Sequence, residues 1–230
     1  MASGVESNPT REMMESLFSV ERVKTFIDAV IAIAITLLIL PLMESASELN
    51  ETAASLGEWM IDHFAQLYGF LISFFIIAMF WAGHRRLFEK VTGLSPVLLR
   101  MNLVWLLTVV WLPVATALTG HVAGADHAVT LLYIGSMFAT SLVWLLIRVH
   151  LARHPQLHTA SPAETVAGVV GASARTLLFV VAAGLALLVP RVNAGWLVLM
   201  VLAGVVGRWL RPLFGRWQPA AGTGGAPNAA

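Results

Sequence analysis

The sequence predicts an all-α, polytopic membrane protein with six transmembrane helices per subunit. Of its 230 residues, 58% are hydrophobic and only 12% are charged, about half the charged fraction of a typical soluble domain. The apolar residues also fall in long runs separated by short polar stretches. A helix needs about 20 mostly apolar residues to cross a bilayer. Six stretches have this character: 25–43, 61–83, 98–119, 127–149, 172–190 and 194–213.

The distribution of charge predicts the orientation of these spans. The connection after the first span carries several Glu and no Lys or Arg, whereas the next connection contains Arg85, Arg86 and Lys90. If the amino terminus is cytoplasmic, only Arg191 falls outside, and we assign Arg175 to the cytoplasmic entry of the fifth span. The positive-inside rule then places both termini in the cytoplasm, which requires an even number of spans.

We divide the chain into a cytoplasmic segment at 1–24, a transmembrane domain at 25–213 and a tail at 214–230. The tail is rich in Gly, Ala and Pro and is predicted to be disordered. Pro155 and Pro162 are expected to break the helix and mark a polar linker. The absence of Cys excludes disulfides and thiolate metal sites, and a net charge of +1 gives no reason to expect nucleic acid as a partner.

Asp28 is the unusual residue of the first span. A carboxylate at the edge of a membrane helix is costly unless it is paired or hydrated. Arg22 and Lys24 lie one to two turns away, and His84 closes the second span on the same side. Asp28 is therefore either a structural clamp between the first span and the second or third, or a proton or cation ligand. Its position near the membrane edge favours the clamp.

A helical stripe in the first span contains Ile33, Thr36 and Leu40, because residues three and four apart share one face. Taken alone, such a stripe is typical of packing core. A lone Thr in a membrane helix often bonds the carbonyl of the preceding turn. The residues themselves thus favour packing over a functional role.

Three ordered motifs lie in or next to the first three spans: one from Arg22 to Pro41, one from Phe80 to Phe88, and one that begins at Asn102. Together they resemble the motifs of the transmembrane protein 175 family, the endolysosomal potassium channels and their bacterial relatives. The family pattern Arg-x-x-x-Phe-Ser-Asp, followed by an apolar helix and Pro, is matched at Arg22, Phe26, Asp28, Ile33, Thr36, Leu40 and Pro41. Ile27 stands where the family has Ser. The second motif runs from Phe80 to Phe88 with Trp81 and His84, and the third begins at Asn102.

The resemblance implies a bacterial single-repeat homologue that forms a homotetramer around a central pore lined by the first span. Ile33 and Leu40 would form apolar constrictions, and Thr36 a selectivity ring. The structural motif would comprise Arg22, Phe26, Asp28, Trp81, His84 and Asn102. The implied function is a potassium-permeable cation channel in the bacterial plasma membrane, with monovalent cations and the lipid bilayer as partners and no cofactor besides permeant K⁺. A hydroxyl ring predicts modest selectivity, since it cannot replace a hydration shell as carbonyl cages do.

Two alternatives stay open, a proton-permeable channel and an ion-coupled secondary transporter. The transporter is disfavoured because midspan charges and matched broken helices are absent from the sequence. We do not expect an enzyme, since Ser136, Ser141 and Ser173 have no intramembrane His or Lys near them in sequence. A metal site is not predicted either. Three histidines are spaced four residues apart, at His150, His154 and His158, but a proline interrupts the helix that would place them on one face.

Overall fold

The computed structural model describes residues 19–47, 55–121 and 127–188, and these are almost entirely helical. The elements are α2 (Val20–Leu37), α3 (Leu40–Ser47), α5 (Leu56–Asp62), α6 (Phe64–Phe88), α7 (Pro96–His121), α8 (His127–Arg153), the short 3₁₀ turn η1 (Pro155–Leu157) and α9 (Pro162–Leu188). The predicted all-α architecture is confirmed for this part of the chain. The predicted span at 194–213, the tail at 214–230 and Arg191 lie outside the described residues.

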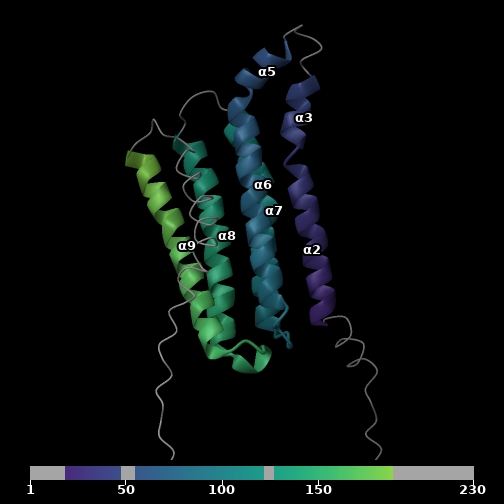
Figure 1. Ribbon diagram of the computed structural model, residues 1–230, viewed down its shortest axis with the longest axis vertical. Coiled ribbons are helices and arrows are strands. Elements are labelled where there is room, and N and C mark those ends of the chain that lie inside the picture. Colours follow the sequence, from purple (N-terminus) through teal and green to yellow (C-terminus); the bar gives the residue numbers. More distant parts are fainter. Residues whose placement is uncertain (1–18, 48–54, 122–126, 189–230) are drawn as a thin grey trace, which may run out of the picture.

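The long helices stand side by side in one bundle, with α2 and α3 at one edge and α9 at the other (Figure 1). Helix α2 packs on α6 and α7, while α8 packs between α7 and α9. Among the described residues, five stretches are long and apolar enough to cross a membrane: Val20–Ser47, Phe64–Phe88, Pro96–Thr119, Ala128–Arg153 and Pro162–Leu185. They match the first five predicted spans.

The first span differs from the prediction because it is interrupted. It begins at Val20, inside the segment we had assigned to 1–24, and Ser19 caps it by accepting a bond from the Arg22 backbone N–H at 3.4 Å. The helix ends at Leu37 and resumes at Leu40. Pro41 lacks the N–H that would bond the carbonyl four residues earlier, and its ring crowds that carbonyl. The proline thus breaks the span and does not close it.

The fifth span also differs, since α9 begins at Pro162 and not at residue 172. Ser161 and Glu164 form a reciprocal cap: the Ser161 N–H donates to Glu164 Oε2 at 3.0 Å, and the Glu164 N–H donates to Ser161 Oγ at 3.3 Å. Proline is favoured in the first turn of a helix because its missing N–H has no partner there. Pro162 therefore starts α9, and Arg175 lies well inside it, contrary to our assignment.

Hydroxyl groups connect the helices within the bundle. Ser73 on α6 lies 2.7 Å from both the Thr116 hydroxyl of α7 and the Tyr133 hydroxyl of α8. Ser141 on α8 lies 2.9 Å from the Thr176 hydroxyl of α9. All five side chains are buried. Interhelical hydrogen bonds and close packing hold membrane helices together, since lipid offers no hydrophobic driving force between them.

Candidate ion pathway

Helix α2 has one face that packs against the bundle. Ile27 and Ile31 are each only 1% exposed, and they belong to the same apolar cluster as Ile76 of α6 and Trp105 of α7. The buried stripe of α2 consists of Val23, Ile27, Ile31 and Ala34. Ile27, the residue at the family's Ser position, therefore fills a dry apolar site, where an isoleucine packs well.

The opposite face of α2 and the start of α3 carry the stripe singled out in the sequence. Ile33 is 58% exposed and Leu40 is 46% exposed in the single subunit, and Thr36 between them is exposed as well. Packing inside the subunit, the interpretation that the residues alone favoured, is therefore wrong for this stripe. The three side chains are accessible to lipid, to another copy of the chain or to an ion path.

The hydroxyl of Thr36 donates to the carbonyl of Ile33 at 2.8 Å, as the sequence suggested for a Thr in a membrane helix. Because the hydroxyl proton is directed back into the helix, the oxygen lone pairs remain available on the exposed face. The side chain can accept a hydrogen bond from water or contact a cation without disturbing α2.

The carboxylate of Asp28 is held by α6. Trp81 Nε1 donates to Asp28 Oδ1 at 2.8 Å, and the Arg85 guanidinium lies 5.7 Å from the Trp81 ring centroid. The expected ion pair with Arg22 or Lys24 does not form within the described chain, where Lys24 pairs with Glu21 at 2.7 Å. This geometry agrees with the clamp interpretation of Asp28, although its partner is a neutral indole.

His84 makes a second connection, between α6 and α7. Asn102 Nδ2 donates to the Leu98 carbonyl at 2.7 Å, which turns Oδ1 toward His84 Nε2 at 2.9 Å. The imidazole is stacked between Phe88 and Trp105, with centroid distances of 4.2 and 4.6 Å. Four residues of the predicted structural motif, Asp28, Trp81, His84 and Asn102, thus link α2, α6 and α7. The other two, Arg22 and Phe26, lie on the exposed face of α2.

Comparisons with known proteins identify chains with similar sequences and a similar fold. Residues 22–113 match the profile of the family described as endosomal/lysosomal potassium channel TMEM175. A potassium channel of Streptomyces collinus is 31% identical over 136 residues, which is 57% of this chain and 64% of the relative. The chain therefore matches slightly less than two thirds of that protein's length. A potassium channel of Chamaesiphon minutus is 28% identical over 138 residues, which is 59% of this chain and 68% of the relative.

Over residues 22–113 the chain therefore resembles the TMEM175 family. Its fold resembles the crystal structure of a lysosomal potassium-selective channel TMEM175 homologue from Chamaesiphon minutus, with a TM-score of 0.71 and 24% identity. The likeness covers 82% of this chain and 97% of that one, and it confirms the multi-pass helical fold. The relatives are named as channels and not as enzymes.

The TMEM175 match contains every residue that we assigned to the pore or to the structural motif, since these residues run from Arg22 to Asn102. Sequence reasoning included Arg85 and Phe88 in the second motif but did not predict which rings they contact, and it missed Trp105. Arg85 over Trp81, and Phe88 and Trp105 around His84, were visible in sequence only as a cluster of aromatic and basic residues near the ends of two spans. Spacing along one helix does not reveal which residues of another helix face it.

The histidines considered for a metal site and the serines considered for an enzyme gain no support from the described structure. His154 Nδ1 donates to the His150 carbonyl at 2.8 Å and His158 Nε2 donates to the Leu151 carbonyl at 3.1 Å. No cluster of three potential metal-ligating side chains occurs in the described part of the chain. Ser136 donates to the Leu132 carbonyl at 2.7 Å, a bond within its own helix.

Proposed function

We propose that this chain is the subunit of a potassium-permeable cation channel that conducts ions passively through a central pore lined by α2. The observation that carries the proposal is the division of α2 into two faces. One face is buried against α6 and α7, and the other exposes Ile33 and Thr36 at the edge of the bundle, where Leu40 at the start of α3 continues the stripe. We propose potassium as the permeant ion because the relatives are named as potassium channels.

We propose that the subunit forms a homotetramer, and the position of α2 supports assembly around an axis. Helix α2 lies at one edge of the bundle (Figure 1), so a single subunit cannot enclose a pore with it. Four copies arranged by rotational symmetry would bring four α2 helices to one axis. Each residue of the exposed stripe then becomes a ring of four.

The chemistry of the rings suits a passive cation path. Ile33 would form an apolar constriction that closes by dewetting, and Leu40 a second apolar ring about two turns away. Thr36 would lie between them with its oxygen lone pairs free. The interruption of the helix between Leu37 and Leu40 supports this placement, because irregular backbone at membrane depth is tolerated where it is packed in protein or lines a watery cavity.

The charges along the bundle suggest its orientation. The start of α2 and the end of α6 lie at the same end of the molecule (Figure 1), and they carry Arg22, Lys24, Arg85 and Arg86. By the positive-inside rule this end faces the cytoplasm, in the plasma membrane of a bacterium. Glu44 near the other end would raise the local concentration of cations at the outer mouth.

Ion flux through purified protein in liposomes tests the proposal. We expect K⁺ to leave K⁺-loaded vesicles down its gradient without a co-substrate, and to generate a membrane potential as it does so. Saturable K⁺ movement that requires a Na⁺ or H⁺ gradient would instead identify an ion-coupled transporter. Dissipation of a pH gradient without any K⁺ current would identify a proton channel.

A further inference from the structure

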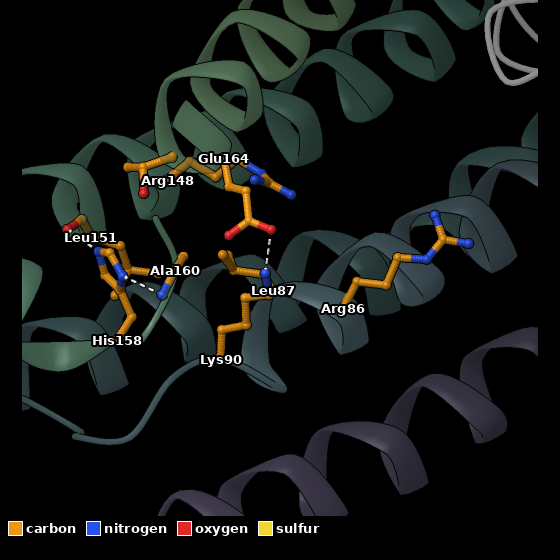
Figure 2. A pocket seen from close by; sticks show the side chains of 9 residues that line it. Arg86, Leu87, Lys90, Arg148, Leu151, His158, Ala160 and Glu164 are labelled. Carbon is orange, nitrogen blue, oxygen red and sulfur yellow. Dashed lines mark hydrogen bonds and ion pairs between the residues drawn. The ribbon is translucent and has the colours of Figure 1, made fainter. Parts of the chain in front are cut away.

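A cavity of about 150 Å³ lies where α6 and α8 end and α9 begins. Most of its lining surface is apolar, and the charged residues that line it are three cations and one carboxylate, Arg86, Lys90, Arg148 and Glu164. Figure 2 shows Glu164 facing Lys90, while the guanidinium of Arg86 extends away from both. We call this cavity the basic pocket. Its volume exceeds that of several water molecules, which is enough for a phosphate group but not for a whole lipid.

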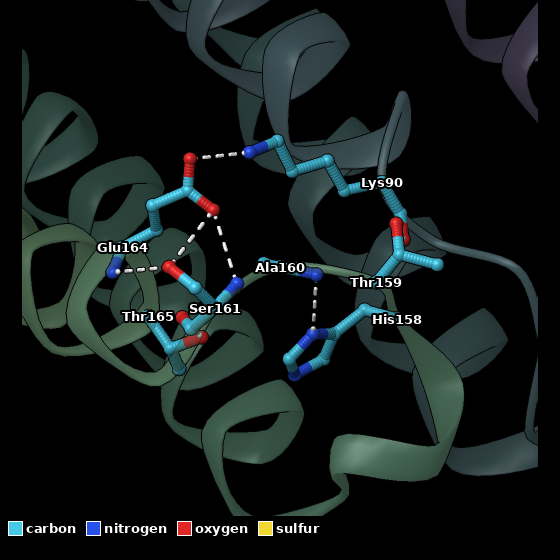
Figure 3. A network of polar contacts seen from close by, with 7 residues as sticks. All are labelled: Lys90, His158, Thr159, Ala160, Ser161, Glu164 and Thr165. Atoms are coloured by element: carbon cyan, nitrogen blue, oxygen red, sulfur yellow. Dashed lines mark hydrogen bonds and ion pairs between the residues drawn. The ribbon is translucent and has the colours of Figure 1, made fainter.

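The wall of the basic pocket is fixed by backbone bonds between two distant connections. The Thr92 N–H donates to the Leu157 carbonyl at 2.9 Å, and the Thr159 N–H donates to the Lys90 carbonyl at 2.8 Å. The Ala160 N–H donates to His158 Nδ1 at 3.2 Å (Figure 3). The cationic side chains therefore project from a braced surface and not from a free loop.

Arg148 is held in place by its neighbours on α8 and α9. Its guanidinium lies 5.0 Å from the centroid of the Trp144 ring, a cation–π arrangement. On the other side is Gly168, where an added Cβ would come within 2.1 Å of Arg148 Nη1. Any side chain at residue 168 would displace the guanidinium, so glycine permits this position of Arg148.

The charges around the basic pocket do not balance, because Lys90 and Arg148 lie beside one carboxylate, Glu164, and Arg86 adds a further positive charge at the edge (Figure 2). Lys90 Nζ and Glu164 Oε1 are 2.5 Å apart, and their side chains are 43% and 54% exposed. Exposed ion pairs of this kind add little stability. A phosphate could therefore replace Glu164 as the partner of Lys90 at small cost, and it would also neutralise the remaining positive charge.

The position of the basic pocket identifies the source of the phosphate. It lies at the ends of three membrane-length helices, at the end of the bundle that the positive-inside rule assigns to the cytoplasm. Leu87 and Leu151 add apolar surface to its lining. We propose that the basic pocket binds the phosphate of an anionic phospholipid headgroup, with the acyl chains lying along the outside of the bundle. Basic pockets between membrane helices on this side are suited to such headgroups.

Lipid binding to the purified full-length protein tests the inference, with native mass spectrometry as the readout. We expect dioleoyl phosphatidylglycerol to bind more tightly than dioleoyl phosphatidylcholine. Arg86→Gln and Lys90→Gln should each weaken phosphatidylglycerol binding about fivefold. Arg153→Gln is the matched control, because Arg153 ends the same helix as Arg148 but lies outside the pocket and is exposed. It should leave the affinity within about twofold of the parent.

Two further variants separate the pocket from a general effect of charge. Glu164→Gln keeps a side chain able to cap α9 but removes the competing carboxylate, so phosphatidylglycerol should bind more tightly. Gly168→Ala changes no charge, yet it should weaken binding by displacing Arg148.

Three results would overturn the inference. Equal affinity for the two lipids would show that anionic charge is not recognised. An equal loss in Arg153→Gln and Lys90→Gln would show that only general surface charge matters. Displacement of phosphatidylglycerol by inorganic phosphate at the same concentration would assign the pocket to soluble phosphate.

Discussion

The indole of Trp81 lies between two charged groups, the carboxylate of Asp28 and the guanidinium of Arg85. Both Asp28 and Trp81 could be selected from the sequence as motif residues. Their bond could not be predicted, because it joins faces of two helices that are 53 residues apart in the chain. The sequence instead suggested nearby cations as partners of Asp28. An indole donor satisfies one carboxylate oxygen without bringing a second charge to the membrane edge.

We expect Asp28→Ala and Trp81→Phe to impair folding or assembly and to leave ion preference unchanged. A hydrogen bond to a charged acceptor contributes about 1.5–3 kcal/mol, so each variant should lower the thermal stability of the complex. The double variant should cost much less than the sum, since both changes remove the same bond. Thr25→Ala is a suitable control, because the Thr25 hydroxyl bonds only the carbonyl of Glu21 in its own helix. A normally assembled Asp28→Ala protein with altered K⁺/Na⁺ preference would make Asp28 a pore ligand.

Thr36 provides a second test at the residue scale. Thr36→Val keeps the shape of the side chain but removes the oxygen, so the preference for K⁺ over Na⁺ should fall while assembly survives. Thr36→Ser retains the oxygen and should keep most of the preference. Reversal potentials with K⁺ and Na⁺ on opposite sides of the membrane measure both. An unchanged potential in Thr36→Val would exclude the hydroxyl from the selectivity ring.

At the scale of helices, hydropathy predicts which segments cross the membrane but not how they begin, break or pair. The search for long apolar stretches found the five described spans because each crossing must exclude charge over a length set by the bilayer.

The early start of α9 could have been recognised from Ser161 and Glu164, whose spacing is that of a capping box. The break before Leu40 depends on Pro41, which we had read as the end of the span. The hydroxyl contacts between helices have no local signal, since Ser and Thr in a span can also bond the backbone of their own helix.

The Ser73 cluster should contribute measurably to helix packing. Tyr133→Phe removes one of the two hydroxyl partners of Ser73. We expect a loss of about 0.6 kcal/mol, the average for interhelical hydrogen bonds in a membrane protein, whose maximum is about 1.7 kcal/mol. Thr108→Val removes a hydroxyl that bonds only the Trp105 carbonyl of the same helix, and it should cost less. Thermal unfolding of both variants in one detergent gives the comparison. A larger loss in Thr108→Val would argue against interhelical bonding as the stabilising feature.

At the scale of the whole molecule, composition predicts a membrane protein because a chain that is 58% hydrophobic cannot cover its apolar surface in water. Composition does not reveal which face of a helix the bundle leaves uncovered. That face is seen only when α2 and α3 lie at the edge of the bundle (Figure 1) with Ile33 and Leu40 exposed. Buried and exposed residues alternate along α2, and mean hydropathy over a span does not distinguish these two faces of the helix.

We expect the active complex to contain four copies of the 24.8 kDa chain. The reason is geometric, since one exposed α2 stripe per subunit forms a closed path only when several subunits surround an axis. The mass of the intact complex in detergent checks this. A monomer or dimer that conducts K⁺ as well as the reconstituted protein would contradict the central pore.

The conductance of Ile33→Ala channels, compared with Ile31→Ala, tests most directly whether the exposed face of α2 lines the ion path. Ile33 is 58% exposed and Ile31 is 1% exposed, although the two are only two residues apart on one helix. We expect Ile33→Ala to widen an apolar ring and raise the single-channel K⁺ conductance with little loss of stability. Ile31→Ala should instead cost about 2–5 kcal/mol of stability without raising conductance. An unchanged or lower conductance in a stably assembled Ile33→Ala channel would remove α2 from the ion path.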